Sequence, residues 1–452
     1  MIQENDHVVS LMMINDCVRK KVSVLTIKLQ SQKEIPCWAV ASEMMIHAVA
    51  VGQKPPFGRY GKLIFLCIKW MNELQLADLV VFFVGFVRAL SLWWKIGKNK
   101  DKKSISYLPK KIFMGFGACS EEYFYEKCKK SNVALIRIHC ETGEGANQIG
   151  RPHLLSLLIM LCKLSFGHCQ KLKNSIYEIS SHLCEFLTVS ALNIGIYTFY
   201  RQFWRIAQSQ NASEVNFLAS DVPLMACVDE GIRSIYIQHG LVAISMMIPQ
   251  VHQINAITMF EKNYFEKYLK NTKVRINENI CTDNRIKKNN VILIVFPKLL
   301  SRMHFQAIDS LIQKAFTLEF KIVFRPTMFV SLRELMLMKK QYPDVIIDDH
   351  LRFFDDSYRQ WNPKILAAWS STSLATALDR GTLPVNLHHP TDLFTQAVYV
   401  TVYPMYNRVM FWPRDTEIIC ETMLSEKEHQ NQIMQLSGYQ DLCLTKKTEE
   451  LI

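Results

Sequence analysis

The sequence predicts an α/β protein of two Rossmann-like domains that face a cleft. Short apolar segments alternate with helical stretches twice along the chain, over residues 111–275 and over residues 290–425. Strands that alternate with helices of roughly 10–15 residues are typical of a parallel sheet covered on both faces. Residues 271–290 are polar and charged, which is typical of a junction between domains.

The composition is that of a globular protein with an excess of positive charge. Apolar residues make up 49% of the 452 residues and charged residues 21%, which excludes a disordered or collagen-like chain. The formal net charge of +12 favours anionic partners: nucleotides, nucleic acid or an anionic membrane surface. The 13 cysteines include no C-x-x-C pair, which fits free thiols in a reducing cytosol, so we expect a cytoplasmic protein.

Residues 1–110 are predicted to form an N-terminal α/β segment, part of which completes the first domain. Within it, residues 74–94 are apolar and long enough for a spanning helix, which needs about 20 residues. Asp78 and Arg88 interrupt this stretch, and a lysine-rich loop follows it. Three interpretations stay open: a spanning helix, a helix that lies on an anionic membrane surface, and a buried amphipathic helix.

In the first domain, an apolar strand ends in a glycine turn and leads into a helix and a second strand, which is a βαβ unit. Helical stretches then fill residues 153–209, and two more strands flank a short helix. The expected strands are at residues 110–116, 133–138, 215–221 and 234–240.

The second domain repeats the alternation and is followed by a polar helical tail at residues 426–452. Its expected helices are at residues 304–318, 331–341 and 372–381. Its expected strands are at residues 291–297, 320–326, 345–349, 364–371 and 383–389.

Candidate functional residues lie at predicted strand ends, because open α/β sheets bind ligands beyond the carboxyl ends of their strands. In the first domain these residues are Gly115, Gly117, Asp221 and His239. The Gly115-Phe116-Gly117 sequence lacks the third glycine of the dinucleotide fingerprint, so we expect a tight turn near the acceptor rather than an NAD site.

Two positions in the first domain could exchange a proton with substrate. Asp229-Glu230-Gly231 precedes a strand, and one carboxylate there could act as a general base toward a sugar hydroxyl. His239, which ends a strand before Gly240, could take a proton or contact phosphate. The alternatives are a solvated loop for the acidic pair and a packed, hydrogen-bonded side chain for the histidine.

The second domain carries the candidate phosphate site. Ser370, Ser371 and Thr372 stand where a strand meets a helix N-terminus, and hydroxyls with free backbone amides there can bind phosphate. The alternative is ordinary N-capping of the helix. Arg325 ends another strand and could grip phosphate with two hydrogen bonds, or form a surface ion pair. His389, followed by Pro390, lies near a further strand end.

These motifs together resemble the GT-B glycosyltransferases, and among them the bacterial capsule and surface-polysaccharide transferases of the sialyltransferase-like and glycerophosphotransferase-like groups. Bacterial sialyltransferases carry an acidic-acidic-Gly motif with the base, and a His-Pro motif and a Ser-Ser/Thr motif near the nucleotide phosphate. Asp229-Glu230-Gly231 and Ser370-Ser371-Thr372 match in type and order. The His-Pro motif is expected at the end of the strand before the serine motif, and this position holds Arg325-Pro326. A His-Pro pair, His389-Pro390, comes after the serines instead.

The resemblance implies an inverting, metal-independent glycosyltransferase without a cofactor. It would move a sugar from a nucleotide-activated donor, CMP-linked acidic sugars among them, to a capsular or other surface polysaccharide or a lipid-linked glycan. The second domain would hold the nucleotide-sugar through Arg325, Ser370, Ser371, Thr372 and His389. The first domain would hold the acceptor, with Asp229 as base and His239 as its rival or partner, on the cytoplasmic face of the inner membrane.

Two other functions stay open. A nucleotide-sugar 2-epimerase has the same two-domain architecture. A non-catalytic nucleic-acid-binding protein is suggested by the charge alone, and it should carry basic residues along one face with interleaved aromatics. The densest lysine run instead lies beside the apolar stretch at residues 74–94, so we expect a membrane surface and no nucleic acid as partner.

Overall fold

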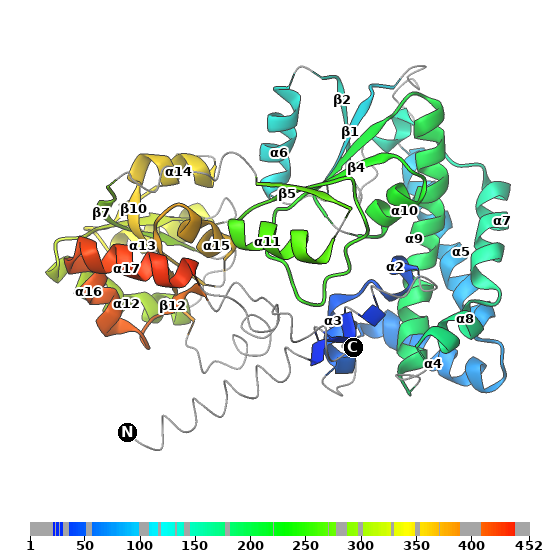
Figure 1. Ribbon diagram of the computed structural model, residues 1–452, viewed down its shortest axis with the longest axis horizontal. Helices are drawn as coiled ribbons and strands as arrows, with labels where there is room; N and C mark the ends of the chain where they lie inside the picture. The colour runs from blue at the N-terminus through cyan, green and yellow to red at the C-terminus, as the bar shows by residue number, and fades with distance from the viewer. Residues whose placement is uncertain are drawn as a thin grey trace.

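The computed structural model contains two α/β domains, each built around a six-stranded sheet in which every strand pairing is parallel (Figure 1). The predicted fold class of two Rossmann-like domains is therefore confirmed. The structure describes residues 21–22, 24–26, 28–29, 36–50, 57–98, 108–115, 119–131, 133–139, 145–176, 181–219, 221–269, 271–276, 287–296, 302–326, 330–348, 353–369, 371–388 and 408–438.

The sheet of the N-terminal domain has the strand order β2-β1-β3-β4-β5-β6. Its central strands are buried on both faces, as expected when helices cover both sides of a parallel sheet. The strands are β1 (Lys111–Gly115), β2 (Leu135–His139), β3 (Glu214–Phe217), β4 (Arg233–Ile237), β5 (Gln253–Ala256) and β6 (Lys273–Ile276).

A long helix, α9 (Leu183–Ser209), is the centre of the helical part of this domain. Its side chains Phe186, Phe199, Phe203 and Trp204 are fully buried, and each contributes about 1.5–3 kcal/mol of hydrophobic stabilisation. The other helices are α2 (Cys37–Val40), α3 (Glu43–Ala50), α4 (Arg59–Glu73), α5 (Ala77–Lys98), α6 (Cys119–Lys129), η1 (Ala146–Gln148), α7 (Leu154–Ser165), α8 (His168–Ser175), α10 (Val222–Asp229) and α11 (Met259–Tyr268).

The sheet of the C-terminal domain has the strand order β12-β11-β10-β7-β8-β9. Its strands are β7 (Asn289–Val295), β8 (Lys321–Arg325), β9 (Ile346–Ile347), β10 (Pro363–Ala368), β11 (Leu383–Asn386) and β12 (Met410–Phe411). Its helices are α12 (Arg302–Thr317), α13 (Leu332–Gln341), α14 (Phe354–Trp361), α15 (Thr372–Asp379), α16 (Thr416–Leu424) and α17 (Glu426–Ser437).

Both sheets contain a topological switch point, where the strand order reverses. In the first sheet β1 lies between β2 and β3, and in the second sheet β7 lies between β8 and β10. The two connections at such a point leave the sheet on opposite faces, so a crevice opens beyond the carboxyl ends of the two strands. The expected ligand positions are therefore the ends of β1 and β3, and the ends of β7 and β10.

The two domains contact each other through polar side chains. Tyr123 on α6 donates a hydrogen bond to Asp355 on α14 at 2.8 Å, and Arg380 donates to the other oxygen of the same carboxylate at 2.6 Å. The backbone amide of Met259, at the start of α11, donates to Asp379 at the end of α15 at 2.5 Å. These contacts join helices that follow strands of both sheets.

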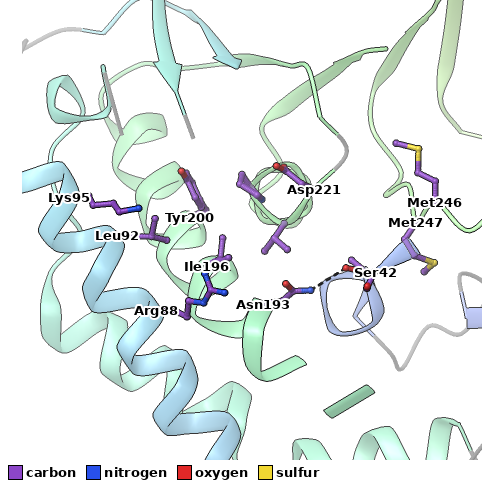
Figure 2. Close-up of a pocket in the computed structure, with 13 residues that line it drawn as sticks. Ser42, Arg88, Leu92, Lys95, Asn193, Ile196, Tyr200, Asp221, Met246 and Met247 are labelled. Carbon is purple, nitrogen blue, oxygen red and sulfur yellow. Dashed lines mark hydrogen bonds between the residues drawn. The ribbon is translucent and has the colours of Figure 1, made fainter. Parts of the chain in front are cut away.

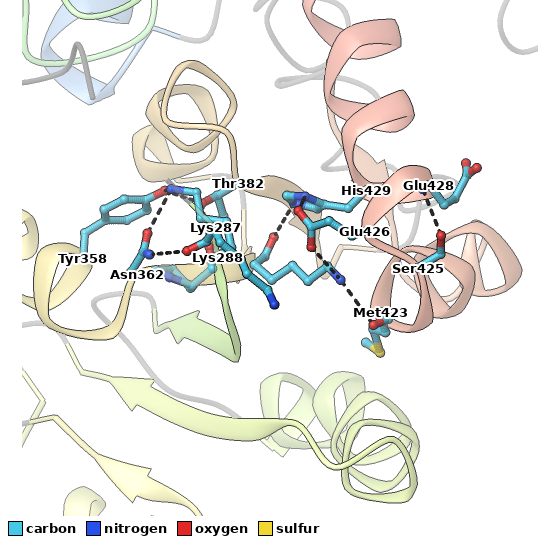
Figure 3. A network of polar contacts seen from close by, with 12 residues as sticks. Lys287, Lys288, Tyr358, Asn362, Thr382, Met423, Ser425, Glu426, Glu428 and His429 are labelled. Carbon is cyan, nitrogen blue, oxygen red and sulfur yellow. Dashed lines mark hydrogen bonds and ion pairs between the residues drawn. The ribbon is translucent and has the colours of Figure 1, made fainter. Parts of the chain in front are cut away.

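The described part of the predicted C-terminal tail is a docked helix rather than a free extension. Lys364 on β10 connects to it: the Lys364 ammonium lies 3.4 Å from the carbonyl oxygen of Met423 and 3.6 Å from the Glu426 carboxylate. Figure 3 shows these two partners, Met423 and Glu426. The ring of His429 lies 3.2 Å from the Lys364 carbonyl oxygen. Because Lys364 is almost fully buried, these partners are needed to offset the cost of burying its charge.

The structure differs from the predicted elements at three places. The described residues before β1 form helices alone, not an α/β segment. The stretch expected to be a junction contains β6, an edge strand in which exposed and half-buried residues alternate, so its sequence is polar. The short elements α14 and β12 were not among the predicted ones.

Candidate functional site

A cavity of about 540 Å³ lies in the N-terminal domain beyond the carboxyl end of β3 (Figure 2). Helices α5 and α9, the start of α10 and two loops enclose it. Its lining combines apolar side chains with a few polar and charged groups, as small-molecule sites do. The lining residues are Ala41, Ser42, Arg88, Leu92, Lys95, Asn193, Ile196, Tyr200, Asp221, Val222, Pro223, Met246 and Met247.

Asp221 is the acidic group of this cavity. It precedes α10, near the switch point between β1 and β3. A carboxylate at a helix N-terminus normally has a lowered pKa, because the helix dipole and the first amides favour the charged form. Here burial outweighs that effect and raises the pKa of Asp221 to about 7, although the backbone amides of Leu224 and Asp221 itself act in the opposite direction. Such a group can accept a proton at neutral pH.

Helix α5 contributes the positive charges of the cavity. Arg88, Leu92 and Lys95 are spaced at i, i+4 and i+7, which places them on one face of the helix. Figure 2 shows this face of α5 across the cavity from Asp221. Arg88 is half-buried, whereas Lys95 is exposed. Among the described lining residues, two cationic groups thus lie on one side of the cavity and a single carboxyl group on the other.

Asp229, the predicted base, lies at the opposite end of α10 from Asp221. The helix has 8 residues and is about 12 Å long. Asp229 accepts a short hydrogen bond from the hydroxyl of Tyr197 on α9. The neighbouring Glu230 pairs with two arginines of α9, Arg201 and Arg205, the latter at 2.7 Å. The structure does not bring Asp229 to the cavity, and its role as a base stays a prediction.

His239 follows β4, at the same edge of the sheet as Asp221. It is half-buried, and burial lowers the pKa of its ring, although a hydrogen bond to the backbone of Leu218 acts in the opposite direction. Leu218 follows β3, so the ring connects the ends of two adjacent strands. His239 is not a lining residue of the cavity, and its part in proton transfer stays a prediction.

Gly115 ends β1, the other strand of the switch point. A Cβ atom at this position would lie 2.1 Å from the carboxylate carbon of Glu121 on α6. Glu121 is almost fully buried and pairs with Arg137 at 2.7 Å. The glycine therefore allows a buried carboxylate to approach the strand. Gly117 lies outside the described residues.

The predicted donor residues lie at the carboxyl edge of the second sheet. Ser371 is the N-cap of α15 and accepts hydrogen bonds from the backbone amide of Ser373 at 3.3 Å and from its hydroxyl at 2.9 Å. Thr372 is the first residue of that helix. Both follow β10, one of the two strands of the switch point between β7 and β10. Ser370 and His389 lie outside the described residues.

Arg325 ends β8, on the far side of β7 from Ser371. Two strand spacings separate β8 from β10, which amounts to about 10 Å. The Arg325 guanidinium donates to the Asp348 carbonyl oxygen at 3.2 Å, and burial lowers the pKa of this half-buried group. The two residues therefore share a sheet edge about two strand spacings apart.

Asn193 and Tyr200 were not predicted as site residues, since nothing in the local sequence marks α9 as the wall of a cavity. Lys95 was considered only as part of the lysine-rich run that follows the apolar stretch. Arg88 was considered only as a charge that interrupts an apolar stretch. Its spacing from Lys95 on one helical face was the available signal.

Comparison with known proteins gives distant structural similarity alone. No protein-family model matches the chain, and no curated protein matches it. The chain is similar to a crystal structure of MurG from Acinetobacter baumannii, with 11% sequence identity and a TM-score of 0.39, over 76% of this chain and 99% of that chain. It is also similar to UDP-GlcNAc 2-epimerase from Methanocaldococcus jannaschii, crystallised with UDP-GlcNAc and UDP, with 11% identity and a TM-score of 0.35, over 72% of this chain and 99% of that chain. Neither similarity assigns a role to a residue of this chain.

Proposed function

We propose that this protein is a glycosyltransferase that moves a sugar from a nucleotide-activated donor to a glycan acceptor. The observation that supports this most directly is the position of Asp221, a carboxyl group of raised pKa in a cavity at the switch point of a parallel sheet. Asp221 would take the proton from an acceptor hydroxyl while the hydroxyl oxygen forms a bond to the anomeric carbon of the donor sugar. The bond from that carbon to the phosphate oxygen breaks, and the nucleotide leaves with the electron pair.

The donor would be held by the C-terminal domain. Ser371 and Thr372 at the N-terminus of α15 lie at the second switch point, where backbone amides and hydroxyls can bind phosphate. We keep Ser370, Arg325 and His389 in this proposed donor site. Positive groups there would stabilise the charge that develops on the leaving nucleotide, so the proposed mechanism needs neither a metal ion nor a cofactor.

The finer assignments are part of the same proposal. A single displacement inverts the anomeric configuration. A CMP-linked acidic sugar is one donor that fits the serine motif, and a capsular or other surface polysaccharide, or a lipid-linked glycan, is the proposed acceptor. The proposed location is the cytoplasmic face of the inner membrane.

A donor screen followed by a transfer assay tests the function. Thermal shift with CMP-, UDP-, GDP- and CDP-linked sugars should identify one nucleotide that stabilises the protein by mass action. That donor should then release free nucleotide only when a glycan acceptor is added. Interconversion of the donor sugar without release would instead indicate the epimerase. Absence of both stabilisation and release for every donor would contradict the proposal.

An exposed apolar face on the N-terminal domain supports membrane association. Among the described residues, two helices are long and apolar enough to cross a membrane by length and composition: Leu183–Ser209, which is 72% buried, and Ala77–Gly97, which is 22% buried. The second helix belongs to α5, which packs between α4 and α7. The exposed apolar residues of these three helices and of the positions that directly flank them are Tyr60, Leu63, Leu66, Trp70, Leu74, Leu76, Phe83, Val87, Trp94, Leu154, Leu155, Ile159 and Phe166.

We propose that this face lies on the bilayer with α5 in the membrane plane. One side of α5 lines the cavity and the helix packs on α9, so α5 is an integral part of the domain. Large exposed apolar patches commonly mark such contact sites. The lysines and arginines of the chain, with a net charge of +12, would add attraction to anionic lipids.

Replacing Phe83 and Leu155 by Asp should weaken vesicle binding at least roughly tenfold, because each side chain loses about 1.5–3 kcal/mol of apolar burial. Flotation with vesicles of phosphatidylcholine and phosphatidylserine measures this. Phe316→Asp is the matched control, since Phe316 is an exposed aromatic residue of α12 in the other domain. Equal binding of the double variant and the control would place the membrane contact elsewhere.

A further inference from the structure

We infer that the cavity binds an acidic group of the acceptor, a phosphate or a carboxylate, through Arg88 and Lys95. The inference rests on the proposed function only in naming the ligand as an acceptor. It concerns the two cations on α5, which play no part in the chemistry assigned to Asp221.

Arg88 carries the inference because its Nε atom is buried at the cavity. Among the described residues, this atom has no hydrogen-bond partner. A buried donor of a charged group that lacks a partner costs free energy, so stable proteins seldom leave one unless a ligand satisfies it. An oxyanion entering the cavity could do so, since guanidinium binds phosphate and carboxylate with paired hydrogen bonds.

The position of Arg88 follows from a close crossing of α5 and α9. A Cβ atom at Gly195 on α9 would lie 2.1 Å from the carbonyl oxygen of Gly85 and 2.8 Å from Cβ of Arg88. Only glycine at that position lets the helices approach so closely. The Cβ atom of Arg88 therefore lies at the contact between α5 and α9, and the side chain lines the cavity (Figure 2). Such packing fixes the position of the Arg88 Cβ atom before a ligand arrives.

The charges around the cavity favour an anion. Lys95 adds a second positive charge on the same face of α5, seven residues beyond Arg88. Among the described lining residues, Asp221 is the only acidic one, and burial favours its neutral form by raising its pKa. Arg88 and Lys95 lie across the cavity from Asp221 (Figure 2). An acceptor could therefore place its acidic group against α5 and its hydroxyl against Asp221.

The rest of the lining suits a sugar ring. Ser42, Asn193 and Tyr200 offer polar groups, and Met246 and Met247 offer apolar contact on the side of Asp221. The Asn193 amide donates to the carbonyl oxygen of Trp38 at 2.9 Å, which fixes the orientation of this side chain. The volume of about 540 Å³ falls within the usual range for small-molecule sites, about 300–1,000 Å³.

Calorimetric binding of simple probes tests the inference without any donor. Glucose 1-phosphate, glucuronate and glucose are titrated into the full chain. The charged probes should bind at least roughly tenfold more tightly than glucose, because a charge-assisted pair contributes about 1.5–3 kcal/mol. The stronger of the two charged probes identifies the acidic group as phosphate or carboxylate.

Arg88→Gln should remove most of this preference and Lys95→Gln part of it. Lys163→Gln on α7 is the matched control, because Lys163 is exposed and does not line the cavity. Equal affinity for the charged probes in Arg88→Gln and the control would overturn the inference, as would equal binding of glucose and the charged probes by the native chain. A lost preference in Arg88→Gln combined with no transfer from any donor would keep the anion site and reject the glycosyltransferase.

Discussion

Asp221→Asn is expected to lower the rate of sugar transfer by about 100- to 10,000-fold, the usual contribution of a general base. The amide keeps the size and shape of the carboxyl group but cannot accept the acceptor proton. The proposed donor site lies in the other domain, so donor affinity should not change. Initial rates of nucleotide release with acceptor present, together with a thermal shift for the donor, measure the two effects separately.

The same residue predicts how activity depends on pH. Asp221 acts as a base only when ionised, and its pKa is raised from the usual acidic range to about 7. The value of kcat/KM should therefore rise with pH through about 7 and level off above it. The Asp221→Asn variant should lack this rise. A native profile that is flat between pH 6 and 8, roughly one unit on either side of that pKa, would remove Asp221 from the base role.

Asp229→Asn is the matched control and also tests the base expected from the sequence motif. Asp229 terminates the same helix but accepts a hydrogen bond from Tyr197 outside the cavity. If Asp221 is the base, Asp229→Asn should retain transfer and lose some stability, since the Tyr197 hydroxyl loses a charged partner. If Asp229→Asn abolishes transfer with the fold intact and Asp221→Asn does not, the motif-based prediction is right.

Most strands of the two sheets could be predicted because they are short apolar runs between turn signals, as β7 and β10 illustrate. Strands such as β6 and β12 were not recognised. Exposure explains the case of β6, which lies at the sheet edge with Lys273 and Arg275 exposed. The helical segment before β1 was hard to assign because its residues pack against α9, more than a hundred positions later. Local patterns carry no information about such pairing.

For the candidate site too, local sequence patterns predicted some features and not others. The ends of β3 and β10 could be predicted as ligand positions, because the carboxyl ends of parallel strands share one edge of the sheet. For Ser371, the motif could not distinguish N-capping from phosphate binding, because a hydroxyl that caps α15 can also face a ligand. The cavity itself could not be predicted. It exists because α5 and α9 cross and set Arg88 against Asn193 and Asp221, residues far apart in sequence.

Gly195→Ala is expected to destabilise the N-terminal domain and to weaken anion binding at the same time. In a helix interior, Ala is normally favoured over Gly by about 1 kcal/mol. Here the added Cβ would meet the Gly85 carbonyl oxygen at 2.1 Å, a backbone atom that cannot rotate away, so α5 and α9 must separate. Overpacking of this kind costs about 1–3 kcal/mol or more, and a net loss of about 2 kcal/mol lowers Tm by roughly 4–8 °C.

The control for this substitution is Gly61→Ala in α4, where the nearest atoms belong to the Phe57 side chain at 3.2 Å and can move. That variant should keep its Tm within about 2 °C. If α5 is displaced by Gly195→Ala, the Arg88 guanidinium moves with it, so glucose 1-phosphate should bind more weakly to the folded variant at a temperature well below its Tm. A variant that is as stable as the native chain would show that the helices can part without cost. A variant that is destabilised yet binds the probe with native affinity would show that the helix crossing does not position Arg88.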